Sequence, residues 1–170
     1  MSSFRKSTAL HKMGFIASAM AVSAFTPFAF AEGYEISVTR KSANLYKVDG
    51  KDIFIRTQYC YEYAYSETAI LEAYGTAGDL KFPDSDSECT VKAVFGKSNQ
   101  KAGKYVVQVS QDNDDWYEVF GQGVYIHTDS CLSMAMNEDA ILDLSPGGYG
   151  SLQVDGEHCT VEGVYSKLKL

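Results

Sequence analysis

The sequence predicts an all-β protein made of two tandem homologous small β units, antiparallel and barrel- or sandwich-like, each closed by one disulfide bond. Three observations lead to this prediction. Short runs of alternating apolar and polar residues, such as 34–38, are separated by turn residues. The chain has four cysteines. It also contains an internal repeat, because a shift of 71 positions, or 70 near the end of the unit, superimposes identical residues: Tyr46 and Tyr117, Gly50 and Gly121, Cys60 and Cys131, Ala64 and Ala135, Glu67 and Glu138, and Cys89 and Cys159.

Residues 1–31 have the features of a secretory signal peptide. Three basic residues flank or precede the start of an apolar run over residues 13–25, and Ala29 and Ala31 supply the small side chains of a cleavage site after Ala31. The apolar run is shorter than the ~20 residues that a membrane-spanning helix needs. We therefore expect a bacterial protein that is periplasmic or secreted, with no membrane insertion after signal cleavage.

The expected mature chain is acidic. Arg5, Lys6 and Lys12 lie in the signal peptide, so 12 basic residues remain against 22 acidic ones, a formal charge of −10. Nucleic acids and anionic lipids attract basic proteins by charge. This charge therefore argues against a nucleic-acid partner.

The cysteines of an exported chain are expected to be oxidised. Four cysteines allow three pairings, which sequence alone does not normally resolve. Since an ancestral single unit would have carried one pair, the repeat favours the pairs Cys60 with Cys89 and Cys131 with Cys159. Pairings exchanged between the units stay open.

The two β repeats are expected at residues 34–97 and 105–170, with a polar linker over 98–104 that contains a glycine. In the first repeat, strands are expected at the following ranges, with equivalents in the second: 34–38, 45–48, 53–57, 80–82 and 89–95.

Two features of the repeat need separate interpretation. Gly50 and Gly121 each follow a strand, which indicates a tight turn with positive φ. The apolar run 69–71 follows an expected turn near Glu67, and because Thr68 before the run could cap a short helix, the type of this element stays open.

Tyrosines occupy alternate positions beside the first cysteine. Tyr61, Tyr63 and Tyr65 correspond to leucine and methionine in the second copy, so their shared property is apolar bulk. This favours a core role for that face of an extended strand. The comparison gives no reason to bury three other tyrosines. Tyr59 corresponds to a serine in the second copy, and Tyr74 and Tyr149 lie in predicted turns. Tyr59, Tyr74 and Tyr149 are therefore the candidate binding residues.

The residue inventory argues against catalysis. The expected mature chain has two histidines, both in one copy, and its cysteines are assigned to disulfides, so we predict no catalytic residues and no cofactor. Carboxylate catalysis through Glu67 and Glu138 is the alternative. No metal site is expected, and weak calcium binding by alternate loop acids is the alternative, through Asp84, Asp86, Asp112 and Asp114.

These observations favour an exported, non-enzymatic binding module of a bacterial envelope. A protein partner is expected, in an inhibitor- or immunity-type role. Alternatives are a carboxylate-based enzyme acting on cell-wall glycans, a glycan-binding module, or a structural envelope subunit. Because core residues are shared between the copies, a local function is expected in the turns that differ.

Overall fold

The computed structural model describes residues 32–74 and 77–169, so the predicted signal peptide lies outside the described residues. These residues form twelve β-strands and no helix, which confirms the all-β prediction. The strands are β1 (Glu32–Ser42), β2 (Leu45–Val48), β3 (Ile53–Gln58), β4 (Glu67–Tyr74), β5 (Ala77–Phe82), β6 (Ser87–Lys97), β7 (Gly103–Asn113), β8 (Trp116–Val119), β9 (Val124–Asp129), β10 (Glu138–Leu144), β11 (Gly150–Val154) and β12 (Glu157–Leu168).

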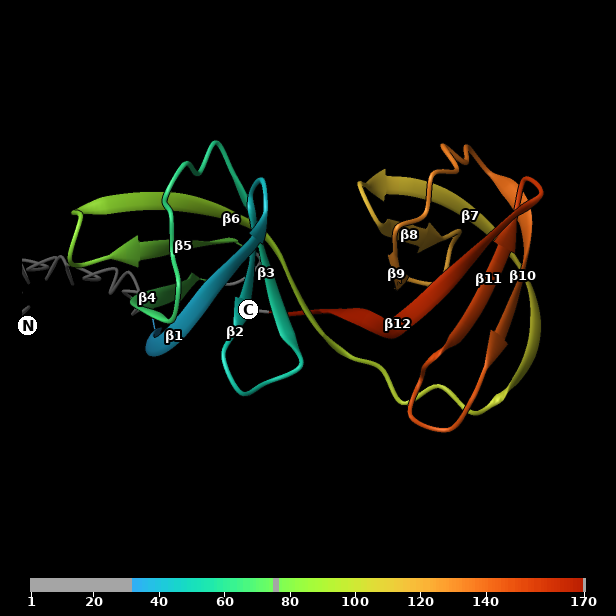
Figure 1. Ribbon diagram of the computed structural model, residues 1–170. Coiled ribbons are helices and arrows are strands. Elements are labelled where there is room, and N and C mark those ends of the chain that lie inside the picture. Colours follow the sequence, from blue (N-terminus) through green and yellow to red (C-terminus); the bar gives the residue numbers. More distant parts are fainter. Residues whose placement is uncertain (1–31, 75–76, 170) are drawn as a thin grey trace, which may run out of the picture.

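Each repeat closes into an antiparallel barrel (Figure 1). In the first, the strand order is β6-β3-β2-β1-β4-β5, and β5 pairs back with β6. In the second, β12-β9-β8-β7-β10-β11 closes through β11 and β12. Closure leaves no free sheet edge within a barrel.

Each barrel contains its own core and its own disulfide. Cys60 is bonded to Cys89, and Cys131 to Cys159, as the repeat predicted. The cysteines are buried with the apolar inward side chains of their barrel. The disulfide thus ties the connection after β3 or β9 to the last strand of the same barrel.

The two barrels are joined by a short antiparallel pairing between β6 and β12. Phe95 pairs with Lys167 and Lys97 with Tyr165, on either side of the pair formed by Gly96 and Ser166. The repeat relates Phe95 to Tyr165 and Lys97 to Lys167. Exchanging the barrels therefore leaves the pairing unchanged, which is the self-complementary pattern of a two-fold interface.

A third core cluster lies between the barrels. Phe54 and Phe95 of the first barrel pack against Trp116 of the second, with ring centroids 5.2 Å apart in both cases. Leu45, Ala93 and Tyr165 complete this buried cluster. The two repeats thus share a hydrophobic core, which the sequence did not decide.

The structure also tests the local predictions for the two turn glycines and for residues 69–71. Gly50 and Gly121 have φ of 69° and 68°, so both tight turns have the expected conformation. Residues 69–71 belong to strand β4, and the short helix considered for them does not form. Ala69 and Leu71 are buried in the barrel core and Ile70 between them is only partly buried, which is the alternation expected of a strand.

Candidate functional site

A long connection crosses one end of each barrel. Residues 59–66 lead from β3 to β4, and residues 130–137 lead from β9 to β10, so each connection passes two intervening strands. We call these the crossing segments. Each begins with a residue at positive φ, Tyr59 at 54° and Ser130 at 53°. The equivalent turns send both segments across the barrel end in the same way.

Four hydrogen bonds hold the backbone of the first crossing segment, and all involve alternate residues. The Cys60 amide donates to the Asn44 side-chain oxygen (2.8 Å), and the Tyr46 hydroxyl donates to the Glu62 carbonyl (2.8 Å). Two further bonds fix its second half, from the Arg40 amide to the Ala64 carbonyl (2.9 Å) and from the Ser66 amide to the Thr39 hydroxyl (3.0 Å).

The second crossing segment repeats this pattern. The Cys131 amide donates to the Asp115 carboxylate (3.2 Å), and the Tyr117 hydroxyl donates to the Ser133 carbonyl (2.6 Å). The amides of Gln111 and Asn137 make the other two bonds, to the Ala135 carbonyl (2.8 Å) and the Ser110 hydroxyl (2.9 Å). The first three alternate residues of each segment are thus directed inward, Ser66 and Asn137 at the ends stay exposed, and the residues between them point outward.

The outward residues form two exposed apolar rows, and this corrects the core role predicted for Tyr61, Tyr63 and Tyr65. Those tyrosines are 83–86% exposed, and Tyr59 is 76% exposed. In the second segment Leu132, Met134 and Met136 are 81–83% exposed. Row 1 hereafter means Tyr59, Tyr61, Tyr63 and Tyr65; row 2 means Leu132, Met134 and Met136.

The physical reason for the correction is the space left under each segment. Tyr46 and Tyr117 are fully buried at these barrel ends and reach the segments with their hydroxyl groups. The buried residues of the first segment are the small Cys60 and Ala64, and Glu62 between them is half-buried. The signal was present in the sequence, since the cysteine and alanine are identical between the copies whereas the outward positions differ.

A groove of about 360 Å³ runs beside row 1. Tyr63 and Tyr65 form one wall, and residues 40–43 form the other. The Arg40 guanidinium lies 5.6 Å from the centre of the Tyr63 ring. A cation against an aromatic face at this distance is attractive, so Arg40 helps to hold that tyrosine in place.

A second hollow, the inter-barrel cleft, has a volume of about 470 Å³. It is lined from both barrels by aromatic, cationic and carboxylate side chains: Lys47, Asp52, Phe54, Lys97, His127, Tyr149, Thr160, Glu162 and Tyr165, with Gly150 and Val161. Its size lies in the range of small-ligand pockets, roughly 300–1,000 Å³.

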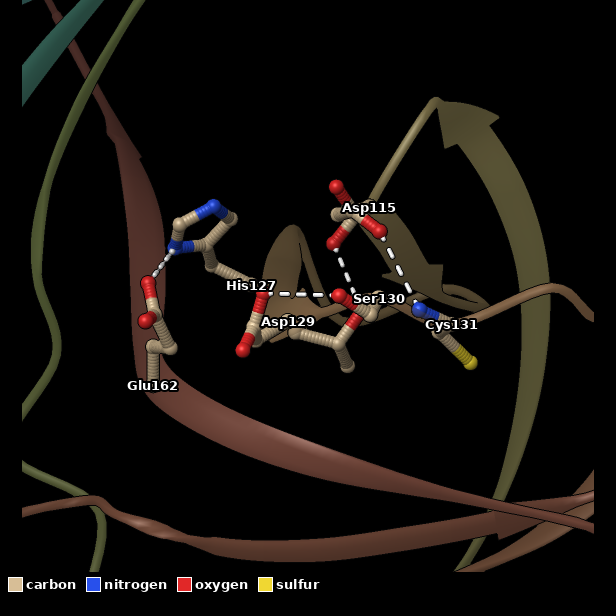
Figure 2. A network of polar contacts seen from close by, with 7 residues as sticks. Asp115, His127, Asp129, Ser130, Cys131 and Glu162 are labelled. Carbon is tan, nitrogen blue, oxygen red and sulfur yellow. Dashed lines mark hydrogen bonds and ion pairs between the residues drawn. The ribbon is translucent and has the colours of Figure 1, made fainter. Parts of the chain in front are cut away.

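His127 in this cleft is held between a ring and a carboxylate. Its imidazole stacks on Trp116 with centroids 4.8 Å apart, and Nδ1 lies 3.3 Å from Oε2 of Glu162. Figure 2 shows this pair beside the separate hydrogen bond that the Cys131 amide, at the start of the second crossing segment, donates to Asp115. Burial lowers the pKa of His127, and the nearby Glu162 opposes part of that shift.

The three tyrosines predicted as binding residues lie on different connections. Tyr59 belongs to row 1, Tyr149 lines the inter-barrel cleft, and Tyr74 ends β4 at the hairpin with β5. All three are exposed, at 76%, 55% and 42%. The structure does not bring them into one site.

The acids considered for calcium and for catalysis do not gather either. Asp112 forms an ion pair with Arg56 of the other barrel, and no group of three or more metal-ligating side chains occurs within residues 32–74 and 77–169. Glu67 and Glu138 start equivalent strands of separate barrels and line neither hollow. Burial raises the pKa of Glu67, with further increases from its neighbours Glu62 and Asp84.

Across the described part of the chain, no helix is both long and apolar enough to cross a membrane. The two disulfides fit an extracellular or periplasmic location. No protein family model, curated protein or solved structure matches this chain. A functional proposal therefore depends on the surfaces themselves.

Proposed function

We propose that this chain is an exported, non-enzymatic protein-binding module of a bacterial envelope, with an inhibitor- or immunity-type role, and that it docks through rows 1 and 2. The observation that supports the proposal is the exposure of seven large apolar side chains at alternate positions of the two crossing segments. Contiguous exposed apolar side chains commonly mark interaction sites.

The side-chain types of the rows suit a protein partner. Tyrosine and methionine are enriched in protein interfaces, and tyrosine is frequent among residues that dominate binding energy. Tyrosine has few rotatable bonds, so ordering it on binding costs little entropy. Methionine is flexible and adapts to a partner's shape.

The backbone under the rows also suits recognition. Backbone hydrogen bonds at four alternate residues and a disulfide fix each crossing segment, so the outward side chains are presented from a rigid support. Preorganisation reduces the entropy lost on association. The copies differ at the outward positions, so each row would contact a different part of the partner.

Affinity capture from envelope and culture-medium extracts tests this proposal. The oxidised mature chain is immobilised beside two variants, Tyr61→Ser/Tyr63→Ser in row 1 and Leu132→Ser/Met134→Ser in row 2. Loss of an exposed tyrosine that dominates an interface costs about 2 kcal/mol. We expect at least one row variant to lose a protein that the wild-type chain retains.

The matched control removes apolar side chains outside the rows. Val106 and Phe120 are 82% and 66% exposed, so Val106→Ser/Phe120→Ser reduces surface hydrophobicity to a similar extent. This control should retain the partner. Equal loss in the control, or equal retention by both row variants, would contradict docking through the rows. Far-ultraviolet circular dichroism verifies that every variant is folded.

A further inference from the structure

We propose that the inter-barrel cleft is a binding site for a small uncharged saccharide, separate from the two apolar rows. The proposal concerns a different surface from the crossing segments and does not depend on the protein-binding function. It follows from the lining of the cleft, its balanced charges and the different residues at the equivalent side of the interface.

The floor of the cleft is aromatic. Phe54 and Tyr165 meet edge to face with centroids 5.2 Å apart, and the His127 ring lies 5.5 Å from Phe54. Phe54 and Tyr165 are each 4% exposed, because they also belong to the shared core of the barrels. The floor is therefore rigid and apolar, but its ring faces are covered, and Lys47 Nζ lies 5.7 Å from the centre of the Phe54 ring. The exposed aromatic ring of the cleft is that of Tyr149, and such a ring favours a ligand with a flat face of C–H groups, as a pyranose has.

The rim of the cleft is polar but balanced in charge. Lys97 Nζ lies 3.6 Å from Asp52 Oδ2, and Glu162 lies 3.3 Å from the His127 ring. With His127 neutral, the cations Lys47 and Lys97 offset the two carboxylates. A net-charged ligand would meet like charges along the rim, whereas hydroxyl groups can donate to carboxylates and accept from ammonium groups.

Tyr149 forms a wall between the floor and solvent. It is 55% exposed, and Lys97 Nζ lies 4.9 Å from the centre of its ring. This contact orients the tyrosine toward the cleft without burying it. In the first barrel the equivalent position, fixed by the pairings of β5 and β11 with the last strands, holds Ala77.

The equivalent side of the interface is built differently. There Arg56 takes the position of His127, and its guanidinium lies 5.0 Å from the Phe95 ring and 5.8 Å from the Trp116 ring while pairing with Asp112. Arg56 thus lies over the aromatic rings on that side, whereas on the cleft side His127 stacks on Trp116 and Lys47 Nζ lies 5.7 Å from the centre of the Phe54 ring. The copies have diverged at the residues that form the cleft.

Trp116 supplies an intrinsic probe for the test. It is the single tryptophan of the chain, and it stacks on His127 directly beneath the cleft. The oxidised mature chain is titrated with N,N′-diacetylchitobiose, maltose and cellobiose, and with inorganic phosphate and glycine as an anionic and a zwitterionic probe. Trp116 fluorescence and ¹⁵N-resolved NMR shifts are followed up to about 10 mM ligand, a range that detects millimolar dissociation constants.

We expect at least one disaccharide to shift resonances from both sides of the cleft, with phosphate and glycine giving no comparable shift. Tyr149→Ala and Glu162→Gln should each weaken binding by about tenfold or more. Tyr74→Ala, which removes an exposed tyrosine from another hairpin, should leave binding unchanged. The Tyr61→Ser/Tyr63→Ser variant should also bind the sugar normally, which separates this site from row 1.

Three results would overturn the proposal. The first is no shift with any of the three disaccharides at the highest concentration. The second is stronger binding of phosphate or glycine than of every sugar. The third is sugar-induced shifts that persist in both cleft variants, which would place the sugar elsewhere on the surface.

Discussion

Removing the Cys60–Cys89 disulfide should destabilise the whole molecule and not the first barrel alone. The two cysteines close a loop with a sequence separation of 29 residues, and their side chains are buried in the core of the first barrel. In the chain-entropy model, opening a loop of this length costs about 3.6 kcal/mol of stability. That is a large fraction of the roughly 5–15 kcal/mol by which folded domains are stable.

Trp116 allows the spread of this loss to be measured. The tryptophan belongs to the second barrel but packs 5.2 Å from both Phe54 and Phe95 of the first. Guanidinium chloride unfolding of Cys60→Ala/Cys89→Ala is followed by tryptophan fluorescence and by circular dichroism. We expect one transition by both probes, with a free energy of unfolding about 3.6 kcal/mol below that of the wild type.

The second disulfide provides the matched control. Cys131 and Cys159 are 28 residues apart, so Cys131→Ala/Cys159→Ala should lose nearly the same stability, again about 3.6 kcal/mol. The reasoning is refuted if removal of the first disulfide leaves the tryptophan transition unchanged, or if circular dichroism resolves two separate transitions. Either result would mean that the barrels unfold independently despite their shared core.

Three further outcomes are expected. Burial lowers the pKa of His127 below 6.5, so the unfolded chain binds this proton more readily and the free energy of unfolding should fall as the pH drops below about 6.5. His127→Gln should remove this part of the pH dependence of stability. A titration followed by Trp116 fluorescence with a midpoint above 6.5 would contradict the lowered pKa. Asp112→Ala leaves the Arg56 guanidinium without its counter-ion and should lower the free energy of unfolding by about 1–2 kcal/mol. Adding Arg56→Met in a double variant should restore part of this stability. Chemical unfolding measures both variants, and a double variant no more stable than Asp112→Ala would argue against an unpaired charge as the cause. Gly150→Ala would place a methyl group against the backbone carbonyl of Asp143 in β10, so it should lower the free energy of unfolding by about 2 kcal/mol or more. An unchanged melting temperature would show that the hairpin of β10 and β11 can shift to accept the methyl group.

Much of the fold could be predicted from the repeat. Residues that are identical in both copies are the ones that the barrel constrains, such as the buried Ala64 and the turn glycine Gly50 at φ 69°. The disulfide pairing followed from the same argument. The strand at residues 69–71 was harder to predict, because a short apolar run is compatible with a helix until its pairing partners are known.

The candidate surfaces were predicted less well. The face of Tyr61, Tyr63 and Tyr65 was interpreted as core because apolar bulk is usually buried, and it proves to be exposed. Which face of an extended segment turns inward depends on the space beneath it, and Tyr46 already fills that space. Tyr149 was correctly predicted to be exposed, but its role as a wall of the cleft depends on residues from both barrels.

The sequence by itself determined the repeating unit, its strands and turns, and the cysteine pairing, because these depend on local periodicity and on a comparison of one copy with the other. Only the tertiary structure decided how the copies meet. The pairing of β6 with β12 about Gly96 and Ser166 places Phe54 of the first barrel against Trp116 and His127 of the second. Trp116 and His127 already lie opposite each other in the pairing of β8 with β9. The shared core and the cleft above it arise from that docking, and no pattern within a single repeat encodes it.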